Sequence, residues 1–208
     1  MGYPFRYGIN SVLLNEAGRR FFDSEFLLGI EPRPNGRVDK TYFTLLCADE
    51  DKDHPLCQGR SDPTPITGTL SSRSAVLFDL DDDGDLDIVT NEMNDRPQVL
   101  ISNLSEKKKI RFLKVKLVGA TSNRDGLGAT VNVQAGGQTF TRYHDGKSGY
   151  LSQSSLPLYF GLGTAERIDG VQVIWPSGSR QELARDIPLN GLLTMKEVEA
   201  EKRKAKSE

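Results

Sequence analysis

The sequence predicts an all-β protein. Twenty glycines and ten prolines are spread along the 208 residues, which favours many short strands and turns over long helices. In the second half, short segments alternate apolar with polar side chains, as strands do when they bury one face. A chain of this length can bury a real core and form one or two domains.

An acidic loop at residues 79–87 is the most informative segment, because it places six carboxylates within nine residues. So much like charge on one loop is self-repelling unless a hard cation lies among it, and calcium takes about six to eight oxygen ligands. Aspartates at alternate positions can point inward together, and Gly84 supplies the sharp turn. We therefore predict a structural Ca²⁺ site. Its predicted ligands are Asp79, Asp81, Asp83, Asp85 (through its backbone carbonyl) and Asp87.

The flanks of this loop favour strands over the two helices of an EF-hand. Residues 75–78 and 86–89 are apolar and rich in β-forming side chains. Thr90 stands where an EF-hand places its glutamate. Asp82 is expected to face outward and to bind no metal. The alternative to a calcium site is an acidic surface turn without a metal ion.

The two cysteines, Cys47 and Cys57, are predicted to form a disulfide. Free thiols, or a metal site shared with His54, are the alternatives, although this spacing is not that of a zinc site. The pair lies in a long, proline-containing connection at about residues 30–72, which we expect to be an inserted loop pinned by the disulfide. A disulfide and a calcium loop together predict a secreted or periplasmic protein.

A faint internal repeat links residues 11–15 to residues 98–103. The second copy follows the acidic loop, and the same offset would place a matching loop ahead of residue 1. We therefore expect this chain to be a fragment of a larger protein. The alternative is a short β extension that folds onto the second half.

The second half is expected to form a small antiparallel β-sandwich or barrel. Its pattern consists of short alternating strands separated by glycine-containing turns. Trp175 should lie in the core, with its N–H bonded at a strand end. The charged residues 198–208 are expected to be a frayed or disordered tail. The strands are expected near residues 113–117, 131–133, 138–143, 171–175, 180–183 and 192–195.

Several function classes find no support in the sequence. The net charge is −2 with both signs interspersed, so no nucleic-acid footprint is present. No apolar run is long enough to span a membrane. His144, Asp145 and Ser148 supply the residue types of a hydrolytic triad, but the residues around Ser148 are not a nucleophile elbow. We therefore expect no catalytic residues and no enzyme.

Two resemblances to known families follow from these motifs. The acidic loop with its flanking strands resembles the FG-GAP/VCBS repeat of integrin-type β-propellers. The segment from about residue 112 to 197 resembles the ASPIC/UnbV domain, and the combination is similar to the C-terminal part of the cartilage acidic protein family. The blocks that carry the second resemblance are SNRDGLGA at 122–129, SGYLSQS at 148–154, YFGLG at 159–163 and VIWPSG at 173–178.

The resemblance implies one or more partial, calcium-binding propeller blades followed by an ASPIC/UnbV domain. On this basis the expected domains are residues 1–108 and residues 109–197, ahead of the charged tail. A propeller closes with several blades, so the remaining blades are expected to be missing from this chain. Members of the family are mostly secreted.

The expected function is a non-catalytic, extracellular interaction or adhesion module in which calcium is structural, and its partner would be a protein or a glycan. The polar loops of the ASPIC/UnbV domain would provide recognition, although they could instead fix loop geometry through hydrogen bonds. Two further alternatives are an enzyme or enzyme accessory of secondary metabolism, and an end-cap that seals a propeller. The candidate recognition residues are Asn123, Arg124, Asp125, Ser148, Tyr150 and Gln153.

Overall fold

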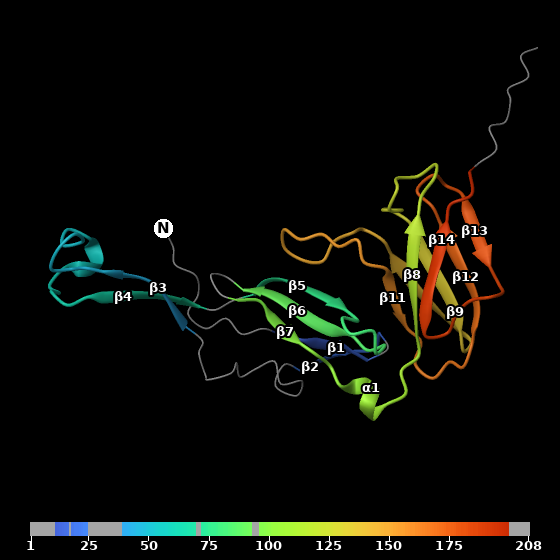
Figure 1. Ribbon diagram of the computed structural model, residues 1–208, viewed down its shortest axis with the longest axis horizontal. Coiled ribbons are helices and arrows are strands. Elements are labelled where there is room, and N and C mark those ends of the chain that lie inside the picture. The colour runs from blue at the N-terminus through green and yellow to red at the C-terminus, as the bar shows by residue number, and fades with distance from the viewer. Residues whose placement is uncertain (1–10, 17, 25–38, 70–71, 93–95, 200–208) are drawn as a thin grey trace, which may run out of the picture. The chain divides into compact units, whose positions relative to one another are not determined.

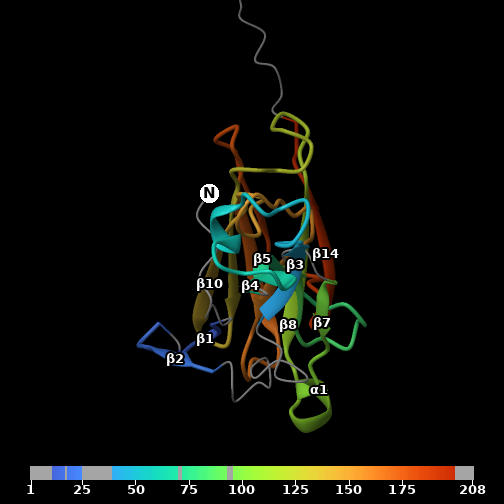
Figure 2. The same cartoon turned by 90° about the vertical axis from the view of Figure 1, so that its left-hand side faces the viewer.

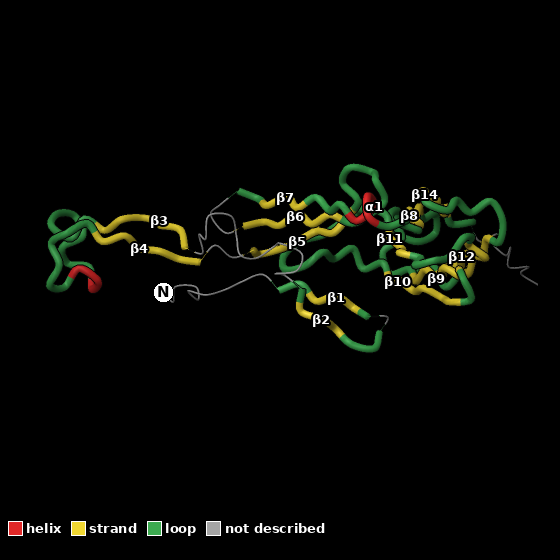
Figure 3. Tube along the Cα trace, turned by 90° about the horizontal axis from the view of Figure 1, so that it is seen from below, coloured by secondary structure: helices red, strands yellow, loops and turns green. Residues whose placement is uncertain are grey.

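A computed structural model describes residues 11–16, 18–24, 39–69, 72–92 and 96–199 (Figure 1). These residues form fourteen strands, a one-turn helix α1 (Leu104–Lys107) and a 3-10 turn η2 (Pro55–Cys57), so the predicted all-β class is confirmed (Figure 3). The chain divides into two compact units. The first comprises Met1–Ala75 with Val89–Leu100, and the second comprises Val76–Ile88 with Ile101–Glu208. Most of the charged tail, residues 200–208, lies outside the described residues.

The first unit contains two antiparallel hairpins. Strands β1 (Leu13–Asn15) and β2 (Phe21–Asp23) form one, and β3 (Asp39–Leu45) and β4 (Thr64–Thr69) form the other. The second hairpin occupies most of the long connection that was expected to be an inserted loop.

The predicted disulfide lies at the end of the β3–β4 hairpin. Cys47 and Cys57 are bonded, with their Cα atoms 5.1 Å apart, so the prediction is confirmed over free thiols and a metal site. Both cysteines are buried in a small cluster with Leu45 and Ile66. The disulfide therefore supplies a covalent link where the apolar core is very small.

Strands β5 (Ser72–Phe78), β6 (Asp87–Glu92) and β7 (Gln98–Leu100) form a three-stranded sheet in that order. The acidic loop connects β5 to β6, so it joins two strands, as its apolar flanks predicted. The residues from 76 to 88, which include the whole loop, belong to the second compact unit, whereas the sequence-based boundary fell between residues 108 and 109.

The second unit is built around a β-sandwich. One sheet has the strand order β10-β9-β12-β13 and the other has the order β11-β8-β14. Side chains from both sheets form one buried cluster, which includes Val115, Val133, Phe160 and Val173. No sheet within the described residues closes into a barrel. The strand bounds are β8 Phe112–Val118, β9 Thr130–Ala135, β10 Gln138–Tyr143, β11 Leu158–Gly161, β12 Ile168–Ile174, β13 Arg180–Leu183 and β14 Gly191–Lys196.

The expectation of a purely antiparallel sandwich is wrong for one strand pair. Strand β14 runs parallel to β8, and both strands are labelled in Figure 2. The register runs from Gly191 opposite Leu113 to Lys196 opposite Val118. Parallel neighbours cannot be joined by a tight turn. Here all the strands from β9 to β13 lie between them in the sequence, so no local signal marked the pairing.

Trp175 lies in this core, as predicted. Its side chain is almost fully buried, and its indole N–H donates to Oε1 of Gln181 at 3.2 Å. Pairing of this N–H at the end of β12 removes the cost of an unsatisfied buried donor.

Candidate functional site

The acidic loop is held in a tight conformation by its own backbone. Asp82 and Gly84 both have positive φ angles, of 61° and 96°. A Cβ atom on Gly84 would lie 2.6 Å from Cε1 of Phe112, so only glycine fits here. The N–H of Asp83 donates to Asp81 Oδ1 at 3.3 Å, and the N–H of Asp85 donates to Asp83 Oδ1 at 3.0 Å. The turn therefore winds the backbone around its own carboxylates.

Asp87 closes the loop. Its Oδ2 accepts a hydrogen bond of 2.8 Å from the N–H of Leu80, and its Oδ1 accepts one of 2.8 Å from the N–H of Ser102. The residue is 1% exposed. A buried carboxylate with two backbone donors ties the start of the loop to its end and to the segment after β7.

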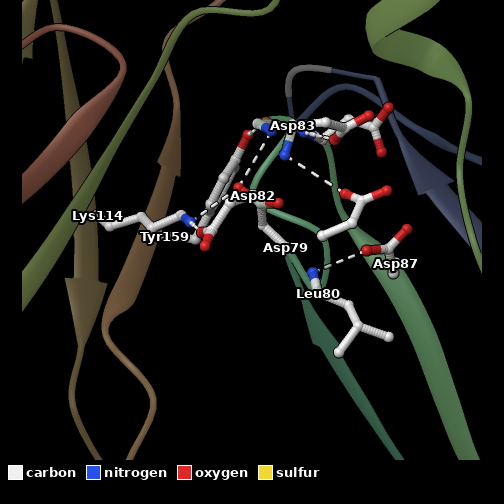
Figure 4. Close-up of polar contacts among 10 residues, drawn as sticks. Asp79, Leu80, Asp82, Asp83, Asp87, Lys114 and Tyr159 are labelled. Atoms are coloured by element: carbon white, nitrogen blue, oxygen red, sulfur yellow. Dashed lines mark hydrogen bonds and ion pairs between the residues drawn. The ribbon is translucent and has the colours of Figure 1, made fainter.

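Asp79 connects the loop to the sandwich. Its Oδ2 accepts from the N–H of Gly84 at 3.1 Å and forms an ion pair of 2.8 Å with Nζ of Lys114 on β8 (Figure 4). Its Oδ1 is buried and has no hydrogen-bond partner among the residues that the structure describes. Lys114 also contacts Asp82 at 2.8 Å. Burial lowers the pKa of Lys114, but its bonds to Asp79 and Asp82 outweigh that effect and raise it.

Asp83 and Asp85 both contact Ser105. The N–H of Ser105 donates to Asp85 Oδ2 at 2.7 Å, and its hydroxyl donates to Asp83 Oδ2. The hydroxyl bond, followed by the N–H of Asp85, holds the pKa of Asp83 below its usual value. The other oxygen of Asp85 is buried and, like Oδ1 of Asp79, finds no hydrogen-bond partner in the described part of the chain.

Three of the five predicted ligands lie together. Carboxylate oxygens of Asp79, Asp81 and Asp87 lie within 4.8 Å of one another. Two oxygens that each lie about 2.3–2.6 Å from one calcium ion can be no more than about 5 Å apart, so this spacing fits a shared ion. The side chains of Asp83 and Asp85 turn toward Ser105. The side chain of Asp82 is 87% exposed and contacts Lys114, which agrees with its expected outward position.

Tyr159, on β11, is a contact that sequence reasoning missed. Its hydroxyl donates to the carbonyl oxygen of Gly84 at 2.6 Å, and its ring stacks on Phe112 with centroids 5.6 Å apart (Figure 4). Burial, followed by the charges of Asp79, Asp85 and Asp83, raises the pKa of Tyr159 to about 12. The hydroxyl therefore stays protonated and keeps donating to the loop at neutral pH.

The loop at residues 122–129 shows hydrogen bonds that fix its geometry. The side chain of Asn123 accepts from the N–H of Leu127 and donates to its carbonyl, both at 2.7 Å. Gly126 has a φ of 68°, and a Cβ there would lie 2.8 Å from Cβ of Leu117. Asn123 and Gly126 therefore shape the backbone at this position.

The other candidate recognition residues have mixed positions. Arg124 and Asp125 form an exposed ion pair of 3.1 Å, and Tyr150 is largely exposed. Ser148 donates through its hydroxyl to Ser152 at 3.1 Å. An isolated antiparallel β-bridge between Lys147 and Gln153 joins the two ends of the segment that contains Ser148 and Ser152.

Two of these residues line an open pocket in the second unit. Asp125 and Gln153 line it together with His144 and Asp145, two of the residues whose types match a hydrolytic triad. Ser148 is not among the lining residues, and no hydrogen bond among the described residues joins His144 to either Asp145 or Ser148. The pocket thus gathers polar groups without assembling the triad geometry.

Glu197 is a further residue that sequence reasoning missed. Its buried carboxylate accepts from the N–H groups of Ala120 and Ser122 at 2.8 and 2.7 Å and from the hydroxyls of Ser122 and Ser177 at 2.8 and 2.6 Å. Desolvation opposes ionisation, but these four bonds outweigh it and lower the pKa of Glu197 to about 2. A glutamate just after a final strand carries no sequence signal of such partners, so only the structure identifies it.

Comparison with known families supports part of the expected organisation. A family model described as ASPIC and UnbV matches residues 119–202, which include all four sequence blocks that carried the resemblance, whereas the expected segment began at about residue 112. The match does not include the acidic loop. A search of curated proteins found no match. Among the helices that the structure describes, none is long and apolar enough to cross a membrane. Residues 119–202 therefore form an ASPIC/UnbV domain, as the sequence predicted.

Proposed function

We propose that this protein is a non-catalytic interaction module stabilised by a structural calcium ion in the acidic loop. The observation that carries the proposal concerns Asp79, which lies beside Asp81 and Asp87. Its Oδ1 is buried and has no hydrogen-bond partner within the described ranges. An unpaired buried carboxylate oxygen is costly, and an oxygen-seeking cation removes that cost.

The charge balance of the loop supports a further cation. Six aspartates lie in the loop, whereas Lys114 is the cation that contacts it among the described residues. Lys114 occupies Oδ2 of Asp79 and leaves Oδ1 free. The residues present therefore fit a calcium ion held by Asp79, Asp81 and Asp87, with the loop backbone contributing carbonyl oxygens.

The position of the loop suggests what the ion would stabilise. Lys114 of β8 and Tyr159 of β11 both bond to the loop, and these strands are neighbours in one sheet of the sandwich. A ligand that binds only the folded state stabilises it by mass action. Calcium bound here would therefore stabilise the unit that contains the ASPIC/UnbV domain.

The interaction role is supported by the polar loops of that domain, which present the exposed residues Arg124, Tyr150 and Gln153. The resemblance of the acidic loop and its flanking strands to an FG-GAP/VCBS repeat implies an adhesion-type partner and further blades. The disulfide fits an oxidising, extracytoplasmic compartment, where calcium is abundant. We therefore place the proposed partner on the extracellular or periplasmic side.

Thermal melting in EDTA and in millimolar calcium, without reductant, tests the calcium proposal. Calcium at about 100 times its dissociation constant would add about 2.7 kcal/mol, which raises the Tm by several degrees. The increase should disappear in Asp79→Asn and Asp81→Asn variants. The matched control is Asp186→Asn, an exposed aspartate with positive φ outside the loop. An unchanged Tm for the native chain would refute the calcium site.

A further inference from the structure

The second unit contains a pocket formed by the loops after β8 and β10. Its volume is about 300 Å³, and it is lined by Asp125, Leu127, His144, Asp145, Gly146, Gln153, Ser154 and Ser155. Binding pockets for small molecules span about 300–1,000 Å³, so this one suits a ligand near the lower limit of size.

His144 is the most informative lining residue. It is only 7% exposed, yet no hydrogen bond to its imidazole occurs among the described residues. Among the described residues, the polar side-chain atoms that are fully buried and lack a hydrogen-bond partner belong to Asp79 and Asp85, and not to His144. The imidazole nitrogens of His144 must therefore retain some exposure, and the pocket is the open surface that this residue lines. A ligand could supply the missing partner.

The walls of the pocket are held by backbone hydrogen bonds. The N–H of His144 donates to Ala129 at 2.8 Å, and the N–H of Gly128 donates to the carbonyl of His144 at 2.7 Å. Across the loop that follows β10, the N–H of Ser154 donates to the carbonyl oxygen of Gly146 at 2.8 Å. The pocket therefore exists before any ligand binds, which reduces the entropic cost of binding.

The lining chemistry disfavours two ligand classes. Among the described residues, no lysine or arginine lines the pocket, whereas two carboxylates do, so phosphorylated and other anionic ligands are disfavoured. Leu127 is the one large apolar lining residue, so an apolar ligand would gain little. The charge of Asp125 is already paired with Arg124 at 3.1 Å. Within the described part of the chain, that pairing leaves Asp145 as the lining carboxylate without a cationic partner.

The remaining groups both accept and donate hydrogen bonds. Asp145 uses Oδ1 to accept from the N–H of Lys147 at 3.0 Å, which leaves Oδ2 available. The amide of Gln153, the hydroxyl of Ser155 and the imidazole of His144 each can donate and accept. We propose that this pocket binds a neutral polyhydroxylated ligand of about one sugar ring, with hydroxyl groups donating to Asp145. This inference rests on the interaction role proposed above and names the chemistry of the partner.

Saturation-transfer NMR on the full chain in millimolar calcium tests the inference. The probes are glucose, galactose and N-acetylglucosamine, with glucosamine and glucose 6-phosphate as charged counterparts. We expect at least one neutral sugar to receive saturation, and to bind about tenfold more weakly in the Gln153→Ala and Asp145→Ala variants, since each removes a hydrogen bond. Gln138→Ala on β10, an exposed glutamine outside the pocket, should bind as the native chain does.

Absence of saturation transfer to every neutral sugar would overturn the inference. So would a neutral-sugar affinity that is unchanged in Gln153→Ala, or saturation confined to one of the charged probes. Gln153 is exposed, so its truncation should leave the fold intact. The calcium melting experiment is an independent readout. A Tm that rises with calcium, without sugar binding, would refute the sugar site alone. Sugar binding without a calcium-dependent change in Tm would refute the calcium site alone.

Discussion

Lys114 of β8 forms an ion pair of 2.8 Å with Asp79, the first residue of the acidic loop. The Asp79 side chain is 1% exposed and the Lys114 side chain is 19% exposed, so water screens this pair weakly. The pair joins the candidate calcium loop to the sandwich that contains the ASPIC/UnbV domain. The Lys114 ammonium therefore offsets part of the negative charge of the loop when calcium is absent.

Replacement of Lys114 by methionine should therefore destabilise the calcium-free protein. Loss of one partner from a buried pair costs about 3–5 kcal/mol, and the partial exposure of Lys114 reduces the expected cost to about 1–3 kcal/mol. The cost should fall in calcium, because the ion supplies positive charge beside Asp79. Urea unfolding in EDTA and in calcium measures both values. Lys116→Met, at the exposed neighbouring position on β8, is the control.

Equal stability of Lys114→Met and the native chain in EDTA would show that the pair contributes nothing. A cost that is the same with and without calcium would show that the ion does not bind beside Asp79.

Glu197 should make the stability of the second unit depend on acid pH. Its pKa is lowered from 4.5 to about 2 in the folded protein, so its contribution is complete above pH 4.5 and is lost as the pH falls toward 2. Glu197→Gln should cost about 1–3 kcal/mol at pH 7, because its amide NH₂ would face the donors that now bind a carboxylate. Denaturant unfolding at several pH values should show this difference shrinking below pH 4.5.

Glu199→Gln, an exposed change two residues away, is the matched control and should alter neither the stability nor its pH dependence. A stability difference between Glu197→Gln and the native chain that does not change with pH would contradict the lowered pKa.

Gly84→Ala should lower the free energy of unfolding of the protein more than Gly137→Ala, a replacement at another glycine with positive φ. Its Cβ would meet Phe112 at 2.6 Å, whereas a Cβ on Gly137, which has a φ of 73°, meets nothing within 4 Å. Both variants bear the backbone cost of about 1 kcal/mol, and Gly84→Ala adds the steric cost of about 1–3 kcal/mol. Chemical denaturation of the two variants isolates the contact. Equal losses would mean that Phe112 moves aside without cost.

Reduction of the Cys47–Cys57 disulfide should destabilise the β3–β4 hairpin and leave the sandwich intact. Closure of so short a loop contributes about 2–3 kcal/mol in the chain-entropy model, and the cluster around Leu45 and Ile66 is too small to replace it. Hydrogen exchange with and without reductant should show faster exchange at β3 and β4 and unchanged exchange at β8 and β12. Protection of β3 that persists in reductant would argue against this role.

Much of the candidate site could be predicted from the sequence because its signals are local. Asp79, Asp81 and Asp87 lie within nine residues, and apolar flanks show that strands enclose them. The partners of these aspartates could not be predicted in the same way. Tyr159 is 75 residues from Gly84, and neither its neighbours nor its spacing indicate that its hydroxyl bonds to the acidic loop. Likewise, nothing near Glu197 in the sequence indicates its contact with Ala120, which is 77 residues away.

By itself, the sequence determined the all-β class, the disulfide, the position of the acidic loop between two strands and the ASPIC/UnbV domain. The all-β class and the position of the loop depend on residue types at short spacing, which strand alternation and turn chemistry constrain locally. The disulfide follows from two cysteines only 10 residues apart. The ASPIC/UnbV domain was predicted from a resemblance to that family. Tertiary structure alone decided the parallel pairing of β14 with β8, the ion pair of Lys114 with Asp79 and the burial of His144 beside a pocket. These depend on which distant strands become neighbours, and that is settled by burial of one shared core rather than by local pattern.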